Sequence, residues 1–335
     1  MMEMNEEKAR QIVQKHKKRF SWKLSLQVVR VLLGIFLIYA VYMITVSLIY
    51  EGTKTGHRTE YYLQLAVDWT VPEVTTDSSL QNSNEISPLL TQKIEIPLVK
   101  TIGRENQQVS TMRVRKPLIS FMTTMTESPN KTEEKMSFYL PYDPETDKKT
   151  DEWSNDEVWN RLEMIHEGNV AQMGFSLNDY YTPEELLKLL EPYDLDTLWM
   201  PLYMGELQSF SEGSWGTSGN NISLGKPWGL AGYRQTDEEF NSVSWATELA
   251  KETITESEQA MLENMELMLS ERKGLAETLL QTDFLQERYD YLKKEGFQVY
   301  GAVVTGPVKE LLKLREVEEI HAEQLGDIDY WNWVE

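Results

Sequence analysis

The sequence contains no cysteine and only four histidines among its 335 residues. Without cysteine the chain can form no disulfide, no thiolate nucleophile and no zinc site of the Cys and His type. His166 and His321 can meet in the fold, but a loop histidine is ordinarily polar surface. Serine nucleophile elbows, phosphate-binding loops and His-Glu-x-x-His motifs are also absent. We therefore expect no enzyme, no cofactor and no metal site.

Charged residues are absent from Val31 to Tyr50, a run of predominantly apolar residues. A helix of this length spans about 30 Å, which matches the hydrocarbon thickness of a bilayer. The run therefore predicts a transmembrane helix. A cleaved signal peptide is the competing interpretation, but its apolar stretch is shorter and ends at small residues.

The charges on the two sides of this run have opposite sign. Residues 1–30 contain eight Lys or Arg and three Asp or Glu, whereas residues 51–335 contain 25 and 51. Because Lys and Arg in short loops stay in the cytoplasm during insertion, we expect a cytoplasmic tail at 1–30 and an extracytoplasmic part from 51. The strong net negative charge of this part argues against nucleic acid and against anionic lipid as its partners, so no nucleic-acid partner is expected.

The tail has two possible roles. Glu3 to Arg19 predicts a helix with acidic residues early and basic residues late, which suits the helix dipole. Its basic end, with Trp22 just beyond, is typical of a topology signal at the lipid surface. Alternatively the tail helix docks on a cytoplasmic protein, and the candidate partner-binding residues are Ile12, Val13, Lys17 and Arg19.

The part beyond the membrane segment predicts two folded regions, with the fold class α+β. We expect a β-rich segment at 51–126, with strands at 93–99 and 109–122 and a turn at 103–108 between them. Residues 127–153 are rich in Pro, Asp, Lys, Thr and Glu and predict a linker in which only Phe138 to Tyr142 can pack. Residues 154–335 then predict an α+β domain.

Helices and strands alternate within 154–335. The strongest local signal is Thr182-Pro183-Glu184-Glu185, a capping box with proline at the first helical position. Residues 208–232 are rich in Ser, Gly and Asn and predict a long loop that rejoins folded structure at Pro227 and Trp228. The other predicted elements are helices at 156–165, 183–191, 236–280 with breaks near 253–256 and Gly274, 283–295 and 308–315, and strands at 169–176, 196–204, 297–305 and 317–330.

Two stretches resemble a known family. Asn169 to Glu206 (NVAQMGFSLNDYYTPEELLKLLEPYDLDTLWMPLYMGE) and Val299 to Leu314 (VYGAVVTGPVKELLKL) are similar to the C-terminal domain of sigma factor regulators. The membrane segment with Lys100 to Leu118 (KTIGRENQQVSTMRVRKPL) is similar to the N-terminal domain of the same family. The resemblance implies an anti-sigma-type, single-pass membrane regulator that restrains an extracytoplasmic-function sigma factor in a Gram-positive bacterium.

The short tail departs from what such a regulator needs to hold a sigma factor. About thirty residues precede the apolar run. The implied partners are therefore an extracytoplasmic-function sigma factor, a small membrane co-regulator, and membrane lipid. The alternative function is a membrane-tethered extracytoplasmic binding or scaffold protein with no sigma contact.

Overall fold

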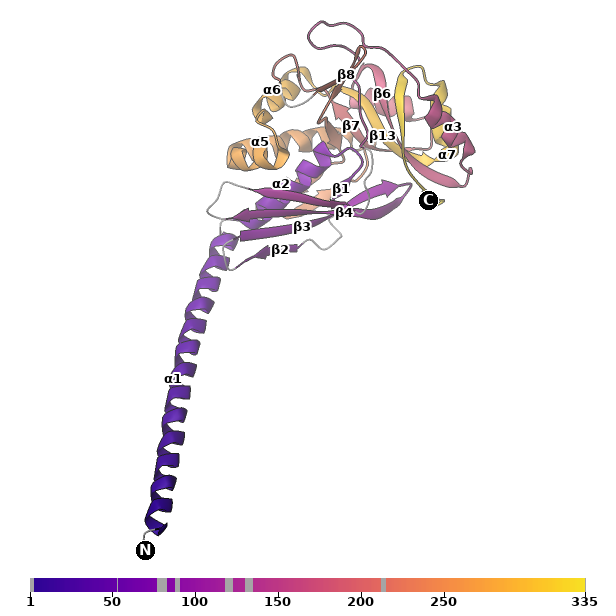
Figure 1. Cartoon of the computed structure of the whole chain (residues 1–335). Coiled ribbons are helices and arrows are strands. Elements are labelled where there is room, and N and C mark those ends of the chain that lie inside the picture. Colours follow the sequence, from indigo (N-terminus) through magenta and orange to yellow (C-terminus); the bar gives the residue numbers. More distant parts are fainter. Residues whose placement is uncertain are drawn as a thin grey trace. The chain divides into compact units, whose positions relative to one another are not determined.

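The structure, a computed structural model, describes residues 3–52, 54–76, 83–87, 91–117, 123–129, 135–211 and 215–334 (Figure 1). The chain divides into two compact units, Met1–Thr53 and Lys54–Glu335. It mixes helices with antiparallel sheets and has one N-terminal apolar helix, which confirms the predicted fold class.

The first unit is a single long helix, α1 (Glu3–Gly52). It joins the predicted tail helix and the predicted membrane segment without an interruption. Within it, Ser25–Ile49 is apolar and long enough to cross a membrane. Large apolar side chains of this stretch are exposed, for example Phe36 at 66% and Ile38 at 74%. Such exposure is costly in water and suits a lipid environment.

The second unit begins with helix α2 (Thr55–Thr70) and a five-stranded antiparallel sheet. The sheet has the order β1-β3-β4-β5. Both β1 and β2 pair with β3, β1 at Leu98 and Val99 and β2 at Gln92 to Glu95. Its strands are β1 (Thr75–Thr76), β2 (Ser83–Ile86), β3 (Thr91–Ile102), β4 (Glu105–Pro117) and β5 (Thr124–Pro129). Both predicted strands are present: β3 extends beyond 93–99 at both ends, and β4 begins at Glu105 rather than 109, because the turn is confined to Gly103 and Arg104 rather than 103–108. The end of the second predicted strand, 118–122, lies outside the described residues.

A second five-stranded sheet has the order β10-β7-β13-β6-β14 and is antiparallel throughout. Its strands are β6 (Asn169–Tyr181), β7 (Asp196–Leu202), β10 (Trp228–Ala231), β13 (Val299–Pro307) and β14 (Ile320–Tyr330). The central strand β13 is buried along its whole length. Its side chains Val299, Val303 and Val304 supply the apolar, β-branched pattern that a strand covered on both faces requires.

Helices pack on and beside this sheet. They are α3 (Asp156–Met164), α4 (Pro183–Leu190), α5 (Ile254–Leu280), α6 (Leu285–Glu295), α7 (Val308–Leu311) and the 3₁₀ helix η1 (Leu312–Glu316). The predicted capping box starts α4: Thr182 accepts from the Glu185 amide, and the Glu185 side chain accepts from the Thr182 amide. Gly296 ends α6 with φ +79°, as predicted from its position.

Three predictions between residues 208 and 280 are wrong. The expected loop at 208–232 contains three strands, β8 (Trp215–Ser218), β9 (Asn221–Leu224) and β10. The expected helix at 236–253 is absent, since β11 (Arg234–Thr236) and β12 (Ser242–Trp245) form a hairpin and α5 begins at Ile254. The second helix break lies at Arg272 rather than Gly274. Strands of three or four residues carry too little periodicity to be recognised. Here β10 pairs with the longer β7, whereas β8 pairs with β9 and β11 with β12.

One hydrophobic core joins the two sheets. It contains α2 residues such as Leu63, β3 residues such as Ile96, β6 residues such as Phe175 and α5 residues such as Met265. Within the predicted linker, Phe138 and Leu140 are buried against the second sheet, as expected for that patch. The boundaries at 126 and 153 stay predictions, while residues 54–335 cluster as one compact unit.

Candidate functional site: the buried polar cluster around α2

The four tail residues predicted to bind a partner all lie on α1. Ile12, Val13, Lys17 and Arg19 belong to its first half, and their side chains are outside the part of the chain that the structure describes. Their role therefore stays a prediction. The described residues direct attention instead to α2, the first element after the apolar helix.

Helix α2 is buried on every side from Tyr61 to Trp69. Leu63 and Tyr62 are fully buried, and even the polar side chains Gln64 and Asp68 are only 4% exposed. The helix contacts α5, β10, β1 and β3, and it lies between the two sheets (Figure 1). A helix enclosed in this way cannot move without disturbing packing throughout the unit, because protein interiors are close-packed.

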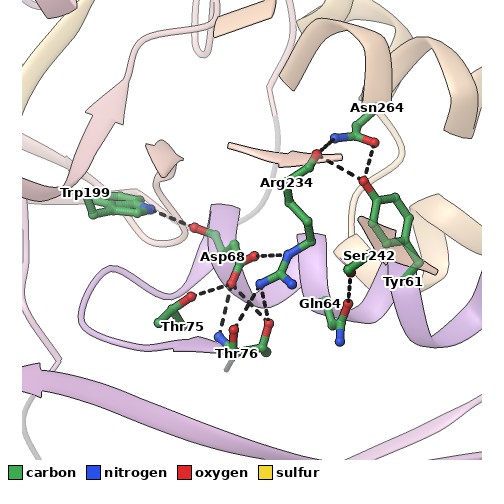
Figure 2. Close-up of polar contacts among 9 residues, drawn as sticks. All are labelled: Tyr61, Gln64, Asp68, Thr75, Thr76, Trp199, Arg234, Ser242 and Asn264. Carbon is green, nitrogen blue, oxygen red and sulfur yellow. Dashed lines mark hydrogen bonds and ion pairs between the residues drawn. The ribbon is translucent and has the colours of Figure 1, made fainter. Parts of the chain in front are cut away.

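An ion pair between Asp68 and Arg234 fixes the end of α2 to β11 (Figure 2). Arg234 Nε lies 2.9 Å from Asp68 Oδ2, and the two side chains are 4% and 5% exposed. Arg234 Nη2 donates to the Thr76 carbonyl oxygen at 3.0 Å and to Thr76 Oγ1 at 2.9 Å. Asp68 Oδ1 accepts from the Thr75 hydroxyl at 2.8 Å and the Thr76 amide at 3.2 Å. Charge and hydrogen-bonding capacity are thus matched at a buried site, as stability requires.

Further hydrogen bonds extend this cluster to α5, β7 and β12. The Tyr61 hydroxyl donates to Asn264 Oδ1 at 2.8 Å, and Asn264 Nδ2 donates to the Arg234 carbonyl oxygen at 2.9 Å. Burial raises the pKa of Tyr61 well above its ordinary value, so this hydroxyl stays a donor. Trp199 Nε1 donates to the Asp68 carbonyl oxygen at 3.1 Å (Figure 2). Elements far apart in the sequence therefore converge on about two turns of α2, from Tyr61 to Asp68.

A cavity of about 710 Å³ adjoins the cluster. The first turn of α2, the β11–β12 hairpin and α5 surround it, and Arg234 and Asn264 form part of its wall. Arg58 lies at its edge, with its guanidinium 4.9 Å from the Phe240 ring centroid and 3.1 Å from Glu271. Seven charged side chains of both signs line the cavity: Lys54, Arg58, Arg234, Asp237, Glu238, Glu263 and Glu271.

Two more buried ion pairs connect other parts of the unit. Lys100 on β3 lies 2.9 Å from Glu73 and 2.8 Å from Asp327, so it ties the first sheet to β14. Arg288 on α6 pairs with Glu206, and its guanidinium lies 4.7 Å from the Trp228 ring centroid. Sequence reasoning missed all three pairs, because no local pattern shows which distant charge meets which.

The described residues contain no group of three or more His, Cys, Asp or Glu that can hold a metal ion. His166 and His321, which the sequence alone allows to meet, lie apart. The β6–β14 register places Asn169 opposite Tyr330 and Ser176 opposite His321, so the two histidines lie near opposite ends of that strand pair. The cluster around α2 contains no nucleophile–base pair, and its chemistry is that of a structural clamp.

Comparison with known proteins bears on both halves of the chain. Residues 10–107 match the family model for the sigma factor regulator N-terminal domain, and residues 162–327 match that for the C-terminal domain. The chain is similar to the probable anti-sigma-M factor YhdL of Bacillus subtilis (strain 168), with 23% identity over 300 residues. The similarity covers 86% of this chain and 74% of that protein. No solved structure matches the chain.

Proposed function

The chain belongs to the sigma factor regulator family, and from this premise we propose that it is a membrane-anchored, anti-sigma-type regulator of an extracytoplasmic-function sigma factor. The observation that carries the proposal is the joint match of both family domains around one apolar helix. A similar protein named as an anti-sigma factor supports the same role.

The proposed orientation has the tail in the cytoplasm and the second unit outside. Its support is the charge asymmetry of the sequence, with a basic tail and a strongly acidic part after the apolar helix. A sigma factor binds DNA in the cytoplasm, so only the tail is available to it in this orientation. The tail portion of α1 before Ser25 is about 33 Å long if helical, which is enough for helix-in-groove recognition.

The α2 cluster is the proposed coupling element. Helix α2 follows α1 in the chain after Gly52, and the Asp68–Arg234 pair fixes its far end to the second half of the unit. An outside event that separates β11 from α2 releases this end. Such an event shifts the second unit from a packing in which α2 is held to one in which it is released. The change then reaches the tail through α1.

Deleting the gene in its host and measuring all transcripts during unstressed growth tests the proposal. We expect one compact regulon, including the operon of the gene itself and a sigma factor gene, to rise together. Unchanged transcripts refute negative regulation and favour the alternative function, an anchored binding or scaffold protein without sigma contact.

Substitution of Ile12 by glutamate tests whether the tail itself holds the sigma factor. A charge on the contact face of the helix disfavours binding, so we expect target transcripts to rise toward the level of the deletion. Gln14→Glu is the matched control, because it adds the same charge about 200° around the helix. Equal transcript levels in both variants and the parent, with normal membrane abundance, contradict direct binding through this face.

A further inference from the structure

Basic side chains gather at one end of the second unit. They come from four elements: Arg58 on α2, Lys93 on β3, Arg115 and Lys116 on β4, and Arg272 at the kink of α5. The β3–β4 register places Lys93 opposite Arg115, Lys116 contacts Thr59 on α2, and Glu271, which precedes Arg272, pairs with Arg58. We call these five residues the basic end. Lys93, Arg115 and Arg272 are exposed, whereas Arg58 and Lys116 are half-buried.

Hydrogen bonds fix the basic end to the first turns of α2. Gln92 Nε2 donates to the Gly56 carbonyl oxygen at 3.2 Å, and Lys116 Nζ donates to Thr59 Oγ1 at 3.3 Å. Figure 1 shows the start of α2 beside β2 and β3. The basic end therefore includes the part of the unit that follows α1 most closely in the chain.

The charges of the basic end are crowded. Burial and the nearby charges of Arg272 and Arg58 lower the pKa of Lys116. Gathering like charges costs stability, which is notable in a region with twice as many acidic as basic residues. An external anion offsets that cost.

Carboxylates near the basic end neutralise it only in part. Glu271 pairs with Arg58 at 3.1 Å, and Glu60, Glu85 and Glu95 lie on the neighbouring parts of α2, β2 and β3. Glu95 is engaged by Arg113 at 3.0 Å. In the part of the chain that the structure describes, Lys93, Arg115 and Arg272 have no carboxylate oxygen within 4 Å. Three exposed cations thus remain available.

Chain length confines the basic end to the neighbourhood of the membrane. The apolar span ends at Ile49, and Lys54 follows five residues later. Five residues reach at most about 18 Å when fully extended, and about 8 Å in a helix. The headgroup layer itself is about 6 Å deep on each side of the hydrocarbon. This limit applies to whichever side of the membrane the second unit occupies.

We propose that the basic end is a docking surface for anionic lipid headgroups of the adjacent membrane leaflet. Lys93, Arg115 and Arg272 contact phosphate groups, and Arg58 and Lys116 add positive potential behind them. Docking holds the first turn of α2 at the bilayer surface while the Asp68–Arg234 pair holds its far end. The proposal requires that α1 crosses the membrane, and it does not require that the tail binds a sigma factor.

The absence of cysteine allows a direct test with the full chain in lipid nanodiscs. A fluorophore is attached through Thr124→Cys on β5, an exposed uncharged position opposite Arg115. Quenching by nitroxide-labelled headgroups is measured in neutral bilayers and in bilayers with about 30 mol% phosphatidylglycerol. We expect stronger quenching in the anionic bilayer, lost at about 0.5 M salt. A second fluorophore position, Lys294→Cys on α6, reports whether the unit as a whole moves closer.

The triple variant K93Q/R115Q/R272Q should return the quenching to the neutral-bilayer level. Each cation near an anionic surface raises the ratio of docked to undocked unit about fivefold. Removing three should therefore lower this ratio about a hundredfold. The matched control K148Q/K188Q/K309Q removes three exposed cations from other elements and should leave quenching unchanged. Equal quenching in both bilayers, or equal effects of the two triple variants, overturns the proposal. Circular dichroism checks that each variant is folded.

Discussion

Replacing Asp68 by alanine removes the central acceptor of the α2 cluster. Arg234 then remains buried at 4% side-chain exposure without its carboxylate, and the Thr75 hydroxyl and the Thr76 amide lose an acceptor. The loss in the free energy of unfolding should therefore exceed that for an exposed ion pair, which is about 0–1 kcal/mol.

The free energy of unfolding should fall by about 3–5 kcal/mol, the range for breaking a buried pair from one side. A change of 1 kcal/mol moves the melting temperature by about 2–4 °C in a unit of this size. The melting temperature of the full chain should therefore fall by about 6–20 °C. The double variant D68L/R234M removes both charges and fills the space, so it should recover most of that loss.

Thermal unfolding of the purified full chain in detergent micelles, followed by tryptophan fluorescence, measures these shifts. The same variants placed in the host should raise the target transcripts, because α2 is less firmly held. A loss below about 1 kcal/mol for Asp68→Ala refutes the assignment of this pair as the clamp on α2. A double variant at least as unstable as the single one refutes the charge argument as well, since packing alone would then explain the loss.

Two further predictions concern pH and backbone packing. Burial and the Glu184 charge raise the pKa of Glu258 to about 7, so the folded state binds the extra proton and stability falls as pH rises from about 4.5 to 7. Glu258→Gln should therefore unfold at higher temperature than the parent at pH 8 and at the same temperature at pH 4.5; equal shifts at both pH values contradict this. Gly301→Ala places a methyl group against the Phe175 carbonyl oxygen and should lower the free energy of unfolding by about 1–3 kcal/mol. Gly274→Ala has open space around it in α5 and should raise that free energy by up to about 1 kcal/mol. Urea unfolding measures both changes.

Local signals in the sequence predicted those elements whose ends are fixed by hydrogen bonds within the same turn of the chain. The capping box at Thr182 gave the start of α4, and Gly296 gave the end of α6, because the backbone groups that these residues satisfy belong to the same turn. The strands β6 and β13 were recognised from their apolar, β-branched residues. The apolar run and its flanking charges predicted the long N-terminal helix and the proposed orientation.

Helix α2 was missed by the same reasoning. Its residues Tyr61 to Trp69 are buried on all sides, so they show no amphipathic stripe, and the sequence read as the entry to a β-rich segment. The strand β10 was missed because four residues in a Gly-rich stretch have no detectable period. Pairing with β7 forms it, through registers such as Trp228 with Leu202.

The sequence by itself determined the family, the fold class, the apolar helix and the difference in charge between the two sides of that helix. The family is identified from the resemblance of whole stretches such as Asn169 to Glu206. The fold class, the apolar helix and the charge difference depend on composition and on short-range periodicity, which folding does not alter. Only the tertiary structure decided that Asp68 meets Arg234, and that Arg58, Lys116 and Arg272 lie close enough to affect one another. Asp68 and Arg234 are 166 positions apart in the sequence, and Lys116 is 57 positions from its partner Thr59 on α2. Only folding of the chain in three dimensions brings such distant residues together.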